Sequence, residues 1–306
     1  MKTLFRNILF FSIPLILFIS FVEYSLRIIP NDYSYKEKYL STKSSGIELL
    51  YLGNSHIYFG LNPEYSKYKS FNAAAISQTI DIDVEILNKY KKWDSLKVIV
   101  LPVDYLTMYF RLENQMDSWR LKNYTLYYGF PSKNIENHFE LFNGKFSKNF
   151  NRLTKYYFQE KNNIDCNKLG FGIDYVFNKS ENLKTTSESA IKRHSININD
   201  PKYKSNFDQN TIVVDRLIKF AKQNKIKLIF VSTPVSKYYF NESNNVQMNK
   251  TLRFVISIVK DNASFCTYLN FMNDKNFVDN DFFDGDHLNN KGAKKFTQML
   301  DDEIKF

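Results

Sequence analysis

Five short, continuously apolar runs, separated by segments with helical spacing, constrain the fold of this chain more than any other feature of its sequence. The runs are 47–53, 71–75, 96–103, 226–234 and 265–271. Helical apolar spacing marks 77–93, 210–225 and 244–261, and a last helix is expected over 289–306. Strands that are apolar throughout are buried on both faces, as happens when helices cover both sides of a parallel sheet. The sequence therefore predicts an α/β fold with a doubly wound, flavodoxin-like parallel sheet.

The stretch from about 105 to 205 breaks this alternation. It is dense in aromatic residues, Asn and Lys, and its periodicity is weak. We interpret it as an irregular insertion or lid rather than an independent domain. The chain has 306 residues, more than the usual size of one domain, which leaves room for such an insertion. The expected organisation is a transmembrane helix over 1–28, a polar tether over 29–46 and a domain over 47–306 that contains the insertion.

An uncharged, almost wholly apolar segment covers residues 7–22, with Lys2 and Arg6 before it. Its length approaches the roughly 20 residues that cross a bilayer as a helix. The sequence FVEYSLRIIP at its end offers no small-residue cleavage site, and the segment lacks the polar face of a core helix. We therefore predict an uncleaved signal-anchor that crosses the cytoplasmic membrane once through residues 7–22. The basic start favours a cytoplasmic N-terminus and an extracytoplasmic C-terminal domain.

The formal net charge of +10 does not predict a nucleic-acid partner. The lysines are scattered singly along the chain, and no nucleic-acid-binding motif is present. The sequence identifies no protein partner. Two cysteines, Cys166 and Cys266, are too few for a disulfide framework and lack metal-ligand spacing. One disulfide and two free thiols both remain open.

Two polar motifs stand where a doubly wound sheet forms its sites, beyond the carboxyl ends of the strands. The first strand ends in Gly53-Asn54-Ser55-His56, and a loop with Asp284 and His287 precedes the last helix. A nucleophilic serine needs a base to take its proton and a carboxylate to orient that base. Asp284, three residues before His287, could fold back onto its ring. These residues suggest Ser55 as nucleophile, His287 as base and Asp284 as orienting acid.

The same motifs resemble the conserved blocks of the SGNH (GDSL-like) hydrolase and acyltransferase superfamily, in its divergent membrane-anchored branch. LYLGNSH is similar to the first block, DGDHLNNKGAKKF to the last, and NAAAISQT (72–79) to the second. In the second block Ser77 takes the place of a glycine whose backbone N–H serves the oxyanion hole. The resemblance implies catalytic Ser55, Asp284 and His287, an oxyanion hole made by the backbone N–H groups of Ser55 and Ser77, and neither metal nor diffusible cofactor.

The chain departs from the family pattern at two places. Asn54 replaces the aspartate of the commoner first block, and the third block's Gly-x-Asn-Asp is missing. Asp104 follows the third strand instead, so no asparagine amide is available to the oxyanion. A carboxylate there would repel the developing charge unless it is protonated or turned away. Losing one such donor can cost roughly 100- to 1,000-fold in turnover.

The resemblance implies a serine esterase or O-acyltransferase that acts on acylated cell-envelope glycans through an acyl-enzyme. Hydrolysis and transfer share that intermediate, so the sequence does not separate them. The alternative is a non-catalytic envelope or glycan-binding protein of the same fold, which Asp104 favours. Among the other candidates, His56 is expected to be structural and His194 to lie on the surface. Asp286 is not expected to be the orienting acid, because the family spacing selects Asp284.

Overall fold

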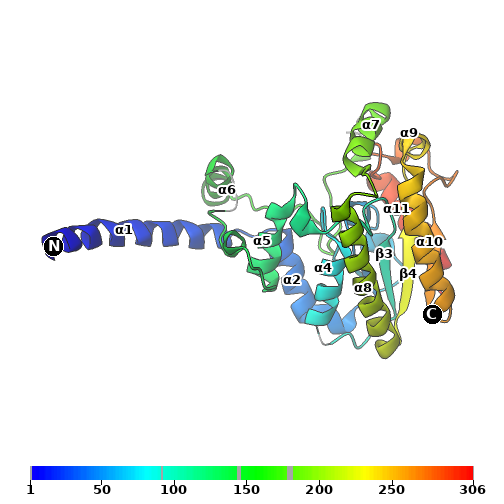
Figure 1. Ribbon diagram of the computed structural model, residues 1–306, viewed down its shortest axis with the longest axis horizontal. Helices are drawn as coiled ribbons and strands as arrows, with labels where there is room; N and C mark the ends of the chain where they lie inside the picture. Colours follow the sequence, from blue (N-terminus) through cyan, green and yellow to red (C-terminus); the bar gives the residue numbers. More distant parts are fainter. Residues whose placement is uncertain (1, 91, 143–145, 178–181, 306) are drawn as a thin grey trace. The chain divides into compact units, whose positions relative to one another are not determined.

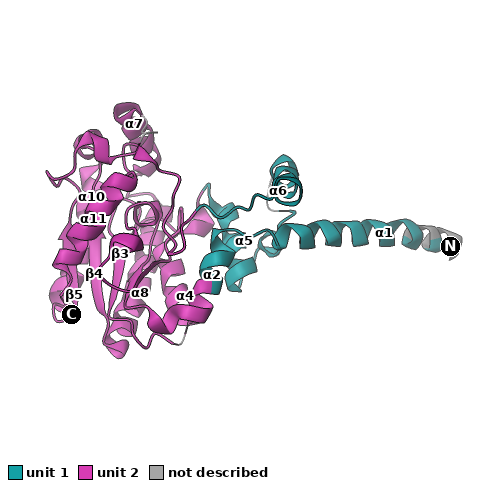
Figure 2. Cartoon of the chain, turned by 180° about the vertical axis from the view of Figure 1, so that it is seen from behind, with its two compact units in different colours: residues 1–38, 116–165 teal, residues 39–115, 166–306 magenta. Residues whose placement is uncertain are grey.

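In this computed structural model, the described residues are 2–90, 92–142, 146–177 and 182–305. The chain divides into two compact units. Unit 1 comprises residues 1–38 and 116–165, and unit 2 comprises 39–115 and 166–306 (Figure 2). Each unit is described by itself below.

Unit 2 is built on a five-stranded parallel sheet in the order β2-β1-β3-β4-β5 (Figure 1). The strands are β1 (Leu49–Tyr51), β2 (Ser70–Asn72), β3 (Val98–Pro102), β4 (Lys227–Ser232) and β5 (Cys266–Asn270). Leu49 pairs with Ser70 on one side and with Val98 on the other. The five apolar runs of the sequence each supply one strand, and the doubly wound, flavodoxin-like α/β prediction is confirmed.

Helices cover both faces of this sheet. Those of unit 2 are α3 (Ser55–Tyr58), α4 (Ile80–Lys89), α7 (Leu183–His194), α8 (Pro201–Asn224), α9 (Lys237–Glu242), α10 (Asn245–Asp261) and α11 (Asn290–Glu303). The crossovers from β2 to β3, β3 to β4 and β4 to β5 all run in one direction, so right-handed connections bring α4, α8 and α10 to one face. The step from β1 to β2 runs the other way. The short helix η2 (Pro63–Tyr65) on that connection contacts α11, which therefore covers the opposite face.

The turn after β1 positions the first motif. Gly53 has a φ of +116°, and a Cβ at this position would lie 2.3 Å from Cδ of Pro102. Only glycine fits, both because of this backbone conformation and because β3 approaches so closely. Asn54 then caps α3, with its side-chain oxygen accepting from the His56 backbone N–H. Ser55 is therefore the first residue of α3, at the carboxyl edge of the sheet.

The stretch expected as an insertion contributes to both units, and its described part adds no strand to the sheet. In unit 1 it contains α5 (Leu121–Asn123) and α6 (Phe146–Gln159). In unit 2 it contains α7, which packs on α9, and the chain leading into α8. Both cysteines, Cys166 and Cys266, are buried free thiols, so the disulfide alternative is not observed.

Unit 1 contains the N-terminal helix α1 (Lys2–Arg27), and α2 (Asp32–Lys43) begins in this unit. Among the described residues, α1 is the helix long and apolar enough to cross a membrane. The relevant segment, Leu9–Arg27, has 19 residues and a mean hydropathy of 2.0, and 17% of its most apolar window is buried. At 1.5 Å per residue it spans about 28 Å, close to the thickness of a bilayer's hydrocarbon core. The apolar helix is thus present, while membrane insertion and orientation stay predictions.

Candidate active site

The structure brings Ser55, His287 and Asp284 together, although the serine and the histidine are 232 residues apart in sequence. Nε2 of His287 lies 2.9 Å from Oγ of Ser55. Nδ1 of the same ring lies 3.0 Å and 3.1 Å from the two carboxylate oxygens of Asp284. Both ring nitrogens are therefore engaged, one by the hydroxyl and one by the carboxylate. This is the geometry that a serine nucleophile requires of its base and orienting acid.

The loop carrying His287 is held from two sides. Asp284 accepts the backbone N–H of His287 at 2.8 Å, which closes a tight turn over the spacing seen in the sequence. Gly285 donates its N–H to the hydroxyl of Thr186 at 2.9 Å and accepts from the backbone N–H of Ser236 at 3.0 Å. Thr186 belongs to α7, so a helix from the aromatic-rich stretch helps to fix the loop. Sequence reasoning left that stretch unmatched and gave it no part in the site.

Aromatic rings pack against the same histidine. Tyr175 stacks between Phe59 and Phe283, with ring centroids 3.7 Å and 4.0 Å away. Its ring meets that of His287 edge-on at 5.4 Å. Only 10% of the His287 side chain is exposed to solvent. The wall of rings limits the imidazole to one orientation and keeps bulk water from most of its surface.

His56, the residue after the nucleophile, lies in a buried ionic network. Its Nδ1 is 3.0 Å from Asp104 and its Nε2 is 3.1 Å from Asp286. Its ring centroid is 5.0 Å from that of His287. Burial by itself would lower the pKa of His56, but hydrogen bonds and charge from the two carboxylates raise it to about 10. The ring is therefore a fixed imidazolium at neutral pH, a role beyond the structural one expected from the sequence.

Asp104 occupies the place of the missing third-block asparagine, and its carboxylate is fully engaged. One oxygen accepts from the side chains of Asn54 at 2.6 Å and His56 at 3.0 Å. The other accepts from the backbone N–H groups of Leu106 and Thr107 at 2.8 Å and 3.0 Å. Burial opposes ionisation, yet these donors hold the pKa of Asp104 below its usual range. The carboxylate is therefore charged, but it is turned toward its hydrogen-bond donors. Of the two conditions that would avoid repulsion of the oxyanion, protonation or turning away, the structure shows the second.

Asp286 is the centre of the network. It is 2% exposed, and its second oxygen lies 3.6 Å from Nδ1 of His287. His194 lies 3.8 Å from it and bonds the Tyr239 hydroxyl at 2.9 Å. Three of the chain's four histidines therefore gather around one carboxylate. The sequence-based interpretation that His194 lies on the surface is wrong, because α7 folds back over the site. Burial lowers the pKa of His194 to about 4, so this ring is neutral.

The charges around His287 favour its protonated form. Burial alone would lower the pKa of His287, but the charges of Asp286 and Asp284 raise it above its ordinary value. The imidazole is thus ready to accept a proton, and the imidazolium that results is stabilised by two carboxylates. From the sequence, both His56 and Asp286 were considered, but no ionic role was predicted for either. The available signal was positional: Asp104 and His56 follow two neighbouring strands, β3 and β1, at the same edge of the sheet.

The second-block loop lies against the turn that holds the nucleophile. Ser77 has a φ of +60°, the left-handed conformation that glycine adopts most easily. The serine thus keeps the backbone shape expected of the glycine it replaces. The buried carboxylate of Asp83 accepts from the Gly53 backbone N–H at 2.9 Å and from the Gln78 side chain at 2.6 Å. Asp83 therefore ties the nucleophile turn to the loop of Ser77. Burial raises the pKa of Asp83 to about 7.

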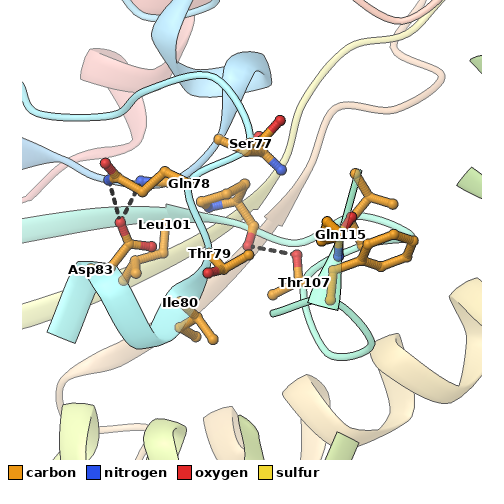
Figure 3. A pocket seen from close by; sticks show the side chains of 13 residues that line it. Ser77, Gln78, Thr79, Ile80, Asp83, Leu101, Thr107 and Gln115 are labelled. Atoms are coloured by element: carbon orange, nitrogen blue, oxygen red, sulfur yellow. Dashed lines mark hydrogen bonds between the residues drawn. The ribbon is translucent and has the colours of Figure 1, made fainter. Parts of the chain in front are cut away.

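A small cavity opens beside these two loops (Figure 3). Its volume is about 60 Å³, and its lining includes Asn54, Ser77, Leu101, Leu106 and Phe110. Figure 3 shows Ser77, Gln78 and Thr79 along one side, with Thr107 and Gln115 across from them. The cavity is mixed in character, because apolar side chains and the amides of Asn54, Gln78 and Gln115 both line it. It is large enough for a small substituent beside the nucleophile turn.

The three side chains of His56, Asp286 and His287 offer possible metal ligands within 4.8 Å of one another among the described residues. Their ring nitrogens already have partners: Asp104 and Asp286 for His56, Asp284 and Ser55 for His287. A cation bound here would have to break the contact between His287 and Ser55 or its orienting bond. The donor set therefore fits proton handling better than metal binding.

Comparisons with known proteins give distant structural likenesses. No protein-family model matches the sequence, and no curated protein is significantly similar to it. A candidate platelet activating factor from Streptococcus pneumoniae is 10% identical, with 96% of this chain and 99% of that chain covered and a TM-score of 0.43. A candidate acylhydrolase from Bacteroides fragilis is 9% identical, with 87% and 95% covered and a TM-score of 0.41. A GDSL-like lipase from Bacteroides thetaiotaomicron is 10% identical, with 89% and 98% covered and a TM-score of 0.40.

Proposed function

We propose that this chain is a serine esterase or O-acyltransferase that works through an acyl-enzyme on Ser55. One observation carries the proposal: His287 lies 2.9 Å from the Ser55 hydroxyl while its other nitrogen is held 3.0 Å from Asp284. A base within hydrogen-bond reach of a hydroxyl, itself oriented by a carboxylate, is the arrangement that activates serine. The SGNH-like motifs described above led to the same three residues.

In the first half of the proposed reaction, Oγ of Ser55 attacks the ester carbonyl carbon and Nε2 of His287 takes the hydroxyl proton. The carbonyl oxygen becomes an oxyanion, which the backbone N–H groups of Ser55 and Ser77 stabilise. The tetrahedral intermediate then breaks its bond to the alcohol oxygen. The alcohol leaves with the proton from His287, and the acyl group remains on Ser55.

In the second half, an incoming hydroxyl attacks the acyl carbon and gives its proton to His287. The bond to Oγ of Ser55 breaks, and Oγ recovers the proton. Water as the attacking group releases a carboxylic acid, and a sugar hydroxyl takes over the acyl group as a new ester. The same three side chains serve both outcomes, so the acceptor alone separates an esterase from a transferase.

Three features support the oxyanion assignment. Ser55 is at the first position of α3, where a helix N–H has no acceptor within the helix. Ser77 retains the backbone conformation of a glycine. The charge of Asp104 is neutralised by its donors, among them the His56 imidazolium, so it does not stand unpaired near the developing negative charge. These features favour the enzyme over the non-catalytic alternative.

We assign the substrate to acylated glycans of the cell envelope, with α1 as a single-pass anchor and unit 2 outside the cytoplasmic membrane. The apolar helix supports the anchor, and the motif resemblance supports the glycan class. The cavity of about 60 Å³ beside Ser77 favours a short acyl group over a fatty acyl chain. Phe110 is one of the residues that line this cavity, so we expect the preference to respond to the size of its side chain.

The test is labelling of the full-length protein with a fluorophosphonate probe, which reacts with activated serines. Labelling that disappears in Ser55→Ala and in His287→Ala supports the proposal. Aryl esters of increasing chain length then test the acyl group: acetate should be preferred, and Phe110→Ala should move the preference toward butyrate. A folded wild-type protein that neither labels nor cleaves any ester would favour the glycan-binding alternative.

A further inference from the structure

Helix α6 in unit 1 turns its apolar face toward solvent. Phe146, Phe150, Leu153 and Tyr157 follow one another at spacings of four, three and four residues, which places them on one side of the helix. Phe146 is 78% exposed and Phe150 is 61% exposed. We call these four residues the aromatic face of α6. An amphipathic helix in water normally turns such a face toward the core.

The polar side of α6 faces inward, and its contacts hold the aromatic face toward solvent. Asn149 is buried and donates to the backbone carbonyl of Glu140 at 3.3 Å. Arg152 bonds the carboxylate of Glu140 at 2.7 Å, and Lys122 bonds it at 2.6 Å. Burial would raise the pKa of Glu140, but these two cations lower it to about 2. Rotating α6 to hide its aromatic face would therefore take Arg152, one of its two cationic partners, away from the buried carboxylate of Glu140.

The same segment packs around the C-terminal end of α1. The carboxylate of Glu23 accepts the backbone N–H groups of Glu140 and Leu141 at 3.0 Å and 2.9 Å. The Tyr157 hydroxyl, at the end of the aromatic face, donates to the Ser25 carbonyl at 3.3 Å. Within unit 1, drawn in teal in Figure 2, α6 lies beside this end of α1. The aromatic face thus begins where the apolar span of α1 ends.

The surroundings of α6 have the composition of a membrane interface. Phe142 and Ile135, on the preceding segment, are also exposed. Lys148 and Lys155 are exposed on other sides of α6, and the helix contains no acidic residue. Aromatic side chains on one face and lysines on another are typical of helices that lie in the headgroup region of a bilayer.

We propose that the aromatic face of α6, together with Phe142, rests in the headgroup region of the bilayer that α1 crosses. The proposal depends on the membrane anchoring by α1 stated above and adds a second lipid contact to it. Lipid is the occupant because the aromatic face is continuous with the end of the membrane span, and the lysines on the other sides of α6 suit anionic headgroups. The expected depth of the apolar face is about 5–10 Å. Unit 1 is then fixed against the membrane by two helices rather than by one.

The test uses the full-length protein in liposomes of mixed zwitterionic and anionic phospholipids, with a nitroxide label on one introduced cysteine. Cys166 and Cys266 are buried, so the label goes to the exposed position. Phe150→Cys probes the aromatic face, Lys148→Cys is the matched control on the same helix, and Ile16→Cys is the reference inside the span. Collision of each label is measured with oxygen, which partitions into lipid, and with a water-soluble nickel chelate.

Labels at positions 150 and 16 should collide several-fold more with oxygen relative to the chelate than the label at 148. If position 16 reports lipid while 150 behaves like 148, the lipid contact of α6 is overturned and the anchor stands. If position 16 also reports water, the anchoring itself fails, and this proposal fails with it. A label at 150 shielded from both reagents would mean that protein covers the face, which overturns lipid as its occupant.

Discussion

Two carboxylates two residues apart, Asp284 and Asp286, differ in their exposure and in the residues that they contact. Asp284 is 16% exposed at its side chain and bonds within its own turn, to the backbone and ring of His287. Asp286 is 2% exposed and reaches His56, more than 200 residues earlier in the chain. The first carboxylate orients the base. The second lies between that base and a buried imidazolium, and its charge affects the pKa of the base. The base is therefore oriented by a residue close in sequence, while its charge state depends on residues far apart in sequence.

The largest effect should come from the residues that both carboxylates serve. Ser55→Ala, His287→Ala and the double variant should each lose at least about 10⁴-fold in aryl acetate hydrolysis, and to the same extent. They are non-additive because losing either residue stops the same proton transfer. Initial rates measure the loss, and thermal melts establish that each variant is folded. A double variant far less active than either single one would show that the two residues act in separate steps.

Asp284→Asn should be the next most damaging change, with a loss on the order of 10²- to 10⁴-fold in kcat. An amide at this position leaves the imidazole present but poorly oriented, and Asp286 is 3.6 Å from Nδ1 without a bond to it. Asp286→Asn should lose far less in kcat, because the orienting bond to Asp284 remains. Equal losses in the two variants would contradict the assignment of orientation to Asp284 and of charge to Asp286.

How much the sequence predicts follows this division between local and distant contacts. The spacing of three residues between Asp284 and His287 is a local feature, and so is the capped turn at Asn54 and Ser55. The five apolar runs also predict their strands, because four of those strands are buried almost throughout and only the edge strand β5 is partly exposed. The pairing of His56 with Asp286 depends on how two ends of the chain meet, which no spacing encodes. The same holds for His194, whose helix returns to the site from a stretch without periodicity.

Asp104→Asn tests the network through stability, although it supplies an amide where the family pattern has an asparagine. We expect a loss of about 2–4 kcal/mol in the free energy of unfolding, because His56 would lose one of its two counter-charges in a buried site. Urea unfolding at pH 7 measures it. Asp279→Asn is the control, since that carboxylate is exposed and pairs with Lys237 on the surface. A gain in both stability and activity would instead mean that an asparagine at this position donates to the oxyanion and that Asp104 is not needed as a counter-charge.

The acidic limb of the pH profile tests whether the charge of Asp286 controls the protonation of His287. His287 must be neutral to act as base, so kcat/KM should rise with pH through its pKa, which lies above the ordinary value of 6.5. The charge of Asp286 is the largest influence raising it. Removing that charge in Asp286→Asn lowers the pKa of His287, so the limb should move to lower pH. An unchanged limb would show that Asp286 does not set the charge state of the base.

The smallest effect should come from His194, the neutral member of the histidine group. Its ring bonds the Tyr239 hydroxyl and stands 3.8 Å from Asp286, beyond hydrogen-bond distance. Because burial keeps it uncharged near neutral pH, it adds packing and one hydrogen bond but no counter-charge. His194→Gln, which can keep the bond to Tyr239, should change kcat/KM by less than about threefold and leave the pH limb in place.

His56→Gln should move that limb, since it removes an imidazolium 5.0 Å from the base. Removing this positive charge should raise the pKa of His287 and shift the limb to higher pH, opposite to Asp286→Asn. If His194→Gln shifts the limb as far as His56→Gln, proximity to Asp286 rather than charge governs the base.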